Sequence, residues 1–128
     1  MKAPLLLSLA LLLGNGFSAA QNYNAGVGSG TGGSYSVFVG PYSGKISTGY
    51  YNSFLGSWSG YVNTTGSFNS FLGSQAGYRN TTGNYNNFVG HNAGYSNTTG
   101  NYNGYFGTEA GYSNATGYQI NLVFKVRR

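Results

Sequence analysis

Acid and base chemistry in this chain could rest on two side chains alone, His91 and Glu109. A catalytic acid and base must meet at one spot, and the chain offers a single acidic residue, a single histidine and no cysteine. Both stand in a repeated sequence whose other copies carry unrelated side chains there. The equivalents of His91 are Ser57, Ser74 and Thr108, and those of Glu109 are Trp58, Gln75 and Asn92. We therefore expect no catalytic residue and no enzymatic activity.

The same scarcity argues against bound metal ions and cofactors. One imidazole and one carboxylate cannot complete the coordination shell of a zinc or calcium ion. The glycine-rich stretch at residues 26–30 lacks the lysine and hydroxyl pair of a phosphate-binding loop. We expect no cofactor and no metal site.

The placement of positive charge argues against nucleic acid as a partner. Beyond the N-terminal segment the cations are Lys45, Arg79, Lys125, Arg127 and Arg128. A nucleic-acid groove needs cations along one face, interleaved with stacking aromatic residues. Because three of these five cations lie in the last four residues, we expect no nucleic-acid partner.

Both candidate residues lie in a series of copies of one 17-residue unit. Aligning the chain on itself at this period superimposes Gly49, Gly66, Gly83, Gly100 and Gly117. The unit reads G-x-[YF]-N-x-[FY]-[LVF]-G-x-x-[AS]-G-Y-x-N-[TA]-T. A fifth, degenerate copy begins at Thr31, with the apolar segment 37–39 displaced by one residue.

The unit predicts strands and turns and excludes helix. Glycine recurs at least every seven residues, and each one costs a helix about 1 kcal/mol relative to alanine. The aromatic and branched segment of the unit suits a strand, and its glycine and asparagine clusters suit corners. We predict an all-β fold, a β-solenoid of about five 17-residue coils with a C-terminal amphipathic strand. The corners are expected at Gly56, Gly73, Gly90 and Gly107, in conformations that other residues resist.

Stacked coils turn each column of the alignment into a ladder with a spacing of about 4.8 Å. Asparagine ladders can bond amide to amide along the stack, and aromatic ladders pack ring on ring. The predicted assembly ladders are Asn52, Asn69, Asn86 and Asn103; Phe54, Phe71, Phe88 and Tyr105; and Tyr61, Tyr78, Tyr95 and Tyr112. In the segment 85–89, Tyr85 and Phe88 point to opposite faces, so at least one aromatic ladder is expected to stay exposed.

Four segments are expected along the chain: a signal peptide at 1–20, a glycine-rich lead at 21–31, the solenoid array at 32–117, and the C-terminal strand at 118–128. Residues 1–20 carry a basic start, an apolar run too short to span a bilayer, and small residues before position 21. We therefore expect a protein that is secreted, without membrane insertion, to the cell surface or the extracellular space.

The C-terminal segment alternates apolar and polar residues, which indicates an amphipathic strand. We predict that this segment is a subunit docking strand, whose apolar side is formed by Tyr118, Ile120, Leu122, Phe124 and Val126. Such a strand can cap its own last coil or add to a neighbouring copy, and the sequence leaves both alternatives open.

The repeats Asn69-Ser70-Phe71-Leu72-Gly73 and Asn86-Asn87-Phe88-Val89-Gly90 resemble those of bacterial surface and tail-fibre proteins. They also look like the repeats in the heads of trimeric autotransporter adhesins, which are β-rolls. In overall plan the chain is similar to curli-type amyloid subunits, with a signal peptide, a glycine-rich lead and about five imperfect repeats. These resemblances imply secretion and assembly outside the cell.

Self-association is the function class that these observations favour. We expect the partner to be the chain itself, as a homo-oligomer or filament that builds an extracellular fibre or surface coat. A trimeric adhesin or fibre head is one alternative, and an ice- or glycan-binding solenoid with a threonine rank at Thr65, Thr82, Thr99 and Thr116 is another. The N-x-T sequons at Asn63, Asn80, Asn97 and Asn114 are interpreted as turn residues.

Overall fold

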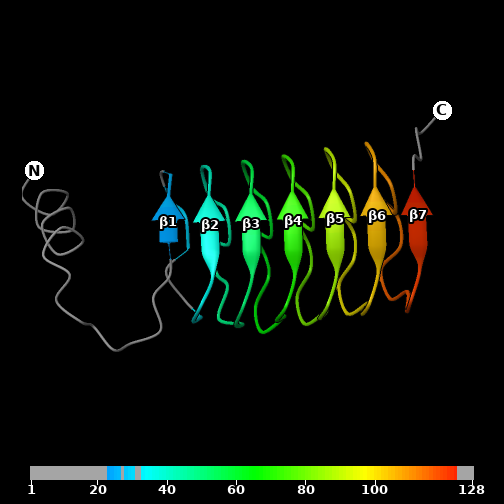
Figure 1. The fold of residues 1–128 in the computed structure, drawn as a ribbon, viewed down its shortest axis with the longest axis horizontal. Helices are drawn as coiled ribbons and strands as arrows, with labels where there is room; N and C mark the ends of the chain where they lie inside the picture. Colours follow the sequence, from blue (N-terminus) through cyan, green and yellow to red (C-terminus); the bar gives the residue numbers. More distant parts are fainter. Residues whose placement is uncertain (1–22, 27, 31–32, 124–128) are drawn as a thin grey trace, which may run out of the picture.

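The computed structural model describes residues 23–26, 28–30 and 33–123, and within them every regular element is a β-strand. Seven three-residue strands occur: β1 (Tyr23–Ala25), β2 (Val37–Val39), β3 (Ser53–Leu55), β4 (Ser70–Leu72), β5 (Asn87–Val89), β6 (Gly104–Phe106) and β7 (Asn121–Val123). They lie side by side in chain order in one parallel sheet (Figure 1). The chain is thus an all-β solenoid of about six turns, as the repeat predicts.

The strand register follows the repeat. From β3 to β6 each strand pairs with the residues 17 positions on, so that Phe54 aligns with Phe71 and Phe71 with Phe88. Between β2 and β3 the offset is 16, because Phe38 pairs with Phe54. This shorter coil is the degenerate copy that the sequence alignment places there. The missing residue is absorbed outside the sheet, and the aromatic column stays in line.

Backbone hydrogen bonds join neighbouring coils outside the sheet as well. The amide of Gly60 donates to the carbonyl of Ala76 at 2.9 Å, and the amide of Thr64 donates to Thr81 at 2.9 Å. In each coil the segment after the strand, such as residues 57–62, forms successive turns. The stack is therefore bonded along its axis on more than one side, which is how a coil of 17 residues holds its shape with so small a core.

Strands β3 to β6 are short because a glycine ends each of them. Gly56, Gly73, Gly90 and Gly107 directly follow the strands, with φ between 125° and 137°. A Cβ on Gly73 would lie 2.5 Å from the carbonyl oxygen of Gly90 in the next coil. Both the backbone angle and the close approach exclude other residues, so the predicted corner role of these glycines is confirmed.

Two further columns adopt the left-handed conformation without being glycine, which the sequence did not predict. The first, Tyr51, Phe68, Tyr85 and Tyr102, has φ of 55° to 59°, and the second, Trp58, Gln75, Asn92 and Glu109, has φ of 56° to 62°. Such residues cost about 1 to 3 kcal/mol each where the surroundings impose them. Here the imposing force is the stack, since the amide of Tyr85 donates to Ser67 in the preceding coil at 3.1 Å.

The core is a narrow column inside the coils. Strands β2 to β6 each contribute their central aromatic ring to it, and the turn segments contribute small residues. The fully buried apolar side chains are Phe38, Phe54, Phe71, Phe88 and Tyr105 from the strands and Ala76, Ala93 and Ala110 from the turns. Gly60 and its equivalents lie against these rings, where a Cβ on Gly60 would be 2.5 Å from the ring of Phe54.

Stacking extends beyond the repeats at both ends. Strand β1 lies in the segment 21–31, where a glycine-rich lead is expected, and Tyr23 pairs with Val37 at an offset of 14. Strand β7 lies in the C-terminal segment and pairs with β6 at the 17-residue offset. The signal peptide expected at 1–20 and residues 124–128 lie outside the described residues.

Candidate assembly ladders

The first asparagine ladder is buried, but its bonds differ from the predicted amide-to-amide pattern. Asn86 Oδ1 accepts a hydrogen bond from the backbone amide of Asn103 at 2.9 Å, and Asn86 Nδ2 donates to the Gly100 carbonyl at 2.8 Å. Asn52, Asn69 and Asn103 make the same two bonds. Each side chain therefore ties its coil to the backbone of the next one. The column does form a ladder, but the predicted amide-to-amide bonding is wrong, and the role of the column in assembly stays a prediction.

The amide-to-amide ladder exists in the other asparagine column. Asn80 Nδ2 donates to Asn63 Oδ1 at 2.7 Å, and Asn97 Nδ2 donates to Asn80 Oδ1 at 2.7 Å. All three side chains are fully buried. A glycan is attached through Nδ2, so this fold leaves no room for one at these three sequons. The interpretation of these asparagines as turn residues agrees with this geometry.

The strand aromatics form a buried ladder. Successive rings of Phe54, Phe71, Phe88 and Tyr105 lie 4.7 to 4.8 Å apart, with interplanar angles of 12° or less. Phe38 extends the ladder at 5.2 Å from Phe54. At the other end, Asn114 Nδ2 donates to the Tyr105 hydroxyl at 2.7 Å, and burial raises the pKa of Tyr105 to about 12.

The third predicted ladder, Tyr61, Tyr78, Tyr95 and Tyr112, is half-buried and also stacked. Its centroid distances are 5.0 to 5.2 Å, with interplanar angles of 9° or less. Burial, followed by the neighbouring Tyr95 and Tyr61 phenols, raises the pKa of Tyr78. Trp58 packs against the start of this ladder at 4.8 Å from Tyr61.

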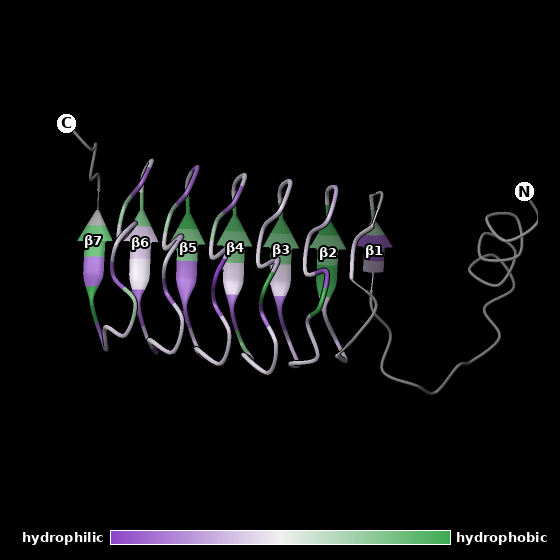
Figure 2. Cartoon of the chain, turned by 180° about the vertical axis from the view of Figure 1, so that it is seen from behind, coloured by the Kyte–Doolittle hydropathy of each residue, from purple (hydrophilic) through white to green (hydrophobic). Residues whose placement is uncertain are grey.

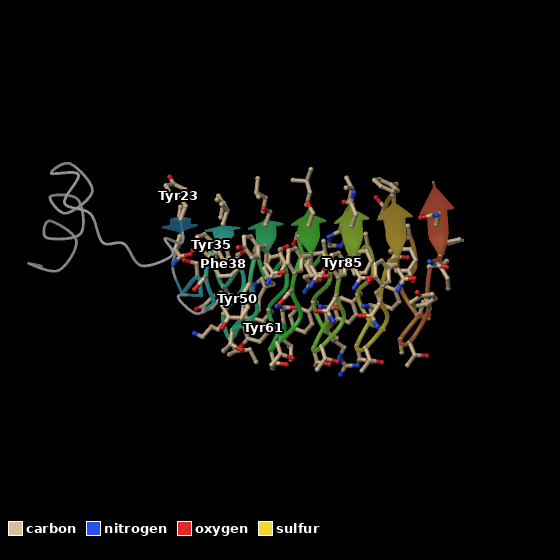
Figure 3. The ribbon with its side chains drawn as sticks, turned by 60° about the horizontal axis from the view of Figure 1, so that its bottom comes forward. Tyr23, Tyr35, Phe38, Tyr50, Tyr61 and Tyr85 are labelled. Carbon is tan, nitrogen blue, oxygen red and sulfur yellow. The ribbon has the colours of Figure 1, made fainter. Side chains whose placement is uncertain are left out.

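A fourth ladder, which was not among the predicted site residues, is the exposed one. It consists of Tyr35, Tyr51, Phe68, Tyr85 and Tyr102, with successive centroids 4.8 to 5.0 Å apart. Figure 3 shows the side chains in rows across the strands, with Tyr35 and Tyr85 labelled in this ladder and Phe38 in the buried one. The expectation of an exposed aromatic ladder is met here. The signal was the column with tyrosine or phenylalanine in every repeat.

The described part of the predicted docking strand, residues 118–123, continues the solenoid. Ile120 lies at the position that asparagine occupies in the first ladder, and its backbone amide donates to Asn103 Oδ1 at 3.0 Å. Leu122 pairs with Tyr105 and takes the place of the ring. Both pack against the core, whereas Tyr118 is exposed and Gln119, with φ of 52°, interrupts the extended backbone. The uninterrupted strand from Tyr118 to Val126 is thus wrong over 118–120. Phe124 and Val126 lie outside the described residues.

His91 and Glu109 lie on neighbouring coils. The amide of Glu109 donates to the His91 carbonyl at 2.8 Å, while His91 Nε2 is 3.1 Å from Asn92 Nδ2. His91 is exposed. In the described part of the chain, no group of three or more His, Asp or Glu side chains could hold a metal ion.

Only one of the two adjacent threonine columns presents a row of exposed side chains. Thr65, Thr82, Thr99 and Thr116 are exposed. The adjacent Thr64, Thr81 and Thr98 each donate their hydroxyl to a carbonyl of the next coil, at 2.9 to 3.1 Å. A flat face with two parallel hydroxyl ranks is therefore not formed at these columns.

Comparison of the chain with family models, curated proteins and solved structures finds no match. Over the described residues, none of the elements is a helix of the length and apolar character that a membrane span requires. The geometry, a parallel β-solenoid with asparagine and aromatic ladders, fits a structural repeat protein. It is compatible with a β-roll of the kind that the repeat motif resembles.

Proposed function

We propose that this chain is a secreted, non-enzymatic structural subunit that assembles with copies of itself into an extracellular fibre or surface coat. The observation that carries the proposal is that the parallel sheet runs along the solenoid axis and has an unpaired strand at each end of its described part. Among the described strands, β1 pairs only with β2 and β7 only with β6. Each terminal strand thus presents an edge to which a further parallel strand can be added.

The C-terminal end is the more apolar of the two. Ile120 and Leu122 pack against the core cluster but are only partly buried. A second copy whose first coil stacks on β7 would complete their burial, at about 1.5 to 3 kcal/mol for each side chain taken fully out of water. Each new main-chain hydrogen bond adds about 0.5 to 1.5 kcal/mol. These gains support end-to-end growth against the entropy lost on association.

The composition supports an extracellular, non-catalytic role. Only 5% of the residues are charged, and no cysteine is present to form disulfides. Small secreted domains usually need such a reinforcement. The stacked backbone bonds and ladders stabilise the coils in their place, and the backbone bonds can continue from one copy to the next.

The experiment is negative-stain imaging and sedimentation of residues 21–128, compared with the same chain lacking residues 118–128. We expect filaments from the first chain and loss of filaments from the second, with a β-type circular dichroism spectrum retained in both. Arg79→Ser is the matched control, because Ser96 and Ser113 occupy the same column. A full chain that stays monomeric at every concentration overturns the proposal. If the truncated chain forms the same filaments at the same rate, β7 has no role in the proposed assembly.

A trimeric head module is the second candidate, and an apolar column on the outer face of the sheet favours it. Leu55 and Leu72 are 40% and 50% exposed. Figure 2 shows this apolar column at the arrowhead ends of β3 and β4. Lateral packing of three copies would bury these side chains. Analytical ultracentrifugation separates the two, since a trimer has a fixed mass and an end-to-end filament grows with concentration.

A further inference from the structure

The exposed ladder contains two tyrosine pairs that are both stacked and open to solvent. The rings of Tyr85 and Tyr102 lie 4.9 Å apart at 2°, and those of Tyr35 and Tyr51 lie 4.9 Å apart at 8°. All four side chains are between 47% and 56% exposed. Phe68 lies between the pairs, in contact with Tyr51 and Tyr85.

Stacking makes these phenols the favoured sites of one-electron oxidation. When a phenol loses an electron, a parallel ring in contact shares the positive charge and so lowers its energy. The exposed hydroxyl can then release its proton directly to water. The unstacked exposed tyrosines Tyr23 and Tyr50 make no ring contact with another described aromatic residue, so they lack this stabilisation.

The side chains that usually intercept oxidants are scarce in this chain. It has no cysteine, its one methionine is Met1, and its one tryptophan is Trp58. Trp58 packs on Tyr42 and Tyr61, which belong to other columns than the exposed ladder. A radical formed on Tyr85 or Tyr102 therefore has no thiol or thioether among the described residues to quench it.

We infer that the pairs Tyr35–Tyr51 and Tyr85–Tyr102 are sites of oxidative cross-linking between copies of the chain. The co-reactant is hydrogen peroxide with a haem peroxidase. Each of two phenols loses one electron and one proton, and the two phenoxyl radicals couple through a new carbon–carbon bond between ring positions ortho to the hydroxyls. The two ortho hydrogens leave those carbons and re-form the hydroxyls. Hydrogen peroxide accepts the two electrons and two protons and becomes two molecules of water.

The bond should join two copies and not the two members of a stacked pair. Coupling joins ring edges, whereas Tyr85 and Tyr102 lie face to face. The backbone also fixes them, since the amide of Tyr85 donates to Ser67 and that of Tyr102 donates to Asn84, at 3.1 and 3.0 Å. The inference rests on the proposed function in one respect, because fibres of assembled copies that pack side by side would bring their exposed ladders edge to edge. It would give a cysteine-free coat its covalent cross-links.

The test treats assembled residues 21–128 with hydrogen peroxide and a haem peroxidase, and follows dityrosine fluorescence, denaturing electrophoresis and mass spectrometry of cross-linked peptides. We expect covalent oligomers. The cross-linked peptides should contain the stacked tyrosines, and their mass should be that of the two separate peptides minus two hydrogen atoms. The quadruple variant Tyr35→Phe, Tyr51→Phe, Tyr85→Phe, Tyr102→Phe should lose them. Phe68 shows that this column accepts phenylalanine. The control Tyr23→Phe, Tyr50→Phe removes exposed but unstacked phenols and should cross-link like the parent chain.

The outcomes separate this inference from the proposed function. Imaging before the oxidant is added shows whether filaments form, and the quadruple variant should form them like the parent chain. If the chain stays monomeric, the proposed function fails, yet dimers linked through the stacked pairs would still support the inference. Cross-links that map to Tyr23 and Tyr50, or that join Tyr85 to Tyr102 within one chain, overturn it.

Discussion

The side chain of a buried asparagine in this solenoid hydrogen-bonds to backbone groups of the next coil, as a peptide group would. Asn86 supplies one acceptor to the amide of Asn103 and one donor to the carbonyl of Gly100, both in the next coil. The invariance of asparagine across the repeats predicts that the column is special. It does not reveal the partner, because the choice between a neighbouring amide and a neighbouring backbone group depends on where the next corner places its carbonyl.

Replacement of Asn86 with alanine should therefore destabilise the fold strongly. It leaves the buried amide of Asn103 without a partner, at about 1 to 3 kcal/mol. The Gly100 carbonyl keeps only its bond from Asn97 Nδ2 at 3.2 Å, and the lost bond from Asn86 adds about 0.5 to 1.5 kcal/mol. We expect a loss of about 2 to 4 kcal/mol in a urea unfolding experiment on residues 21–128. Asn87→Ala, next to it on the exposed side of β5, is the control and should change stability by about 0.5 kcal/mol or less. Equal effects from the two variants would contradict the ladder's role.

Tyr105 gives the fold a pH dependence in the alkaline range. The unfolded phenol titrates near 10 and burial raises the pKa in the folded chain to about 12. Since the folded state holds the proton more tightly, this stabilisation is complete below pH 10 and is lost as pH rises through 12. Tyr105→Phe should flatten the fall of the urea midpoint between these pH values. The exposed control Tyr118→Phe should leave the fall as it is, and a flattening by both variants would exclude Tyr105 as the cause.

At the level of the element, the corner decides where each strand ends. The glycines at these corners could be predicted, because a residue repeated at every corner with no side chain indicates a backbone requirement. The left-handed aromatics could not, because tyrosine and phenylalanine ordinarily favour strands, and the local pattern gives no sign of a positive φ. The stack imposes that conformation on Tyr85 through its bond to Ser67, a contact 18 residues away in sequence.

Two substitutions in one coil test the corner. Gly73 has φ of 136° and faces the Gly90 carbonyl, so Gly73→Ala should destabilise the coil by at least about 1 to 3 kcal/mol. Gln75 has φ of 58°, which glycine adopts freely, so Gln75→Gly should be neutral or stabilising by up to about 1 kcal/mol. Thermal unfolding followed by circular dichroism compares them. A tolerated Gly73→Ala would show that the corner accepts a side chain.

In the molecule as a whole, the 17-residue period determines the fold of the coils, whereas the two terminal strands form because an adjacent coil pairs with them. A repeat of 17 residues with glycine corners was enough to predict coils, ladders and parallel stacking. The two terminal strands do not follow the residue pattern. Asn121, Leu122 and Tyr23 join the sheet because the adjacent coil offers backbone partners in register, and such partners leave no mark in the sequence. The residues that replace the ladders, Ile120 and Leu122, conceal the continuing period.

Because each coil contacts only its neighbours, the molecule should tolerate a change in the number of coils. Duplicating residues 84–100 inserts one whole unit, with its Asn86, Phe88 and Gly90 equivalents, between β5 and β6. Every ladder then gains one member and every backbone bond finds its partner, so stability should rise with the added coil interface. We expect a higher urea midpoint and a steeper dependence on urea, since more surface is exposed on unfolding. The matched control is the same insertion with serine at the positions equivalent to Asn86 and Phe88, which keeps the length but interrupts two ladders. It should lower the midpoint below that of the parent chain, and a control as stable as the intact duplication would mean that length and backbone bonds alone hold the stack.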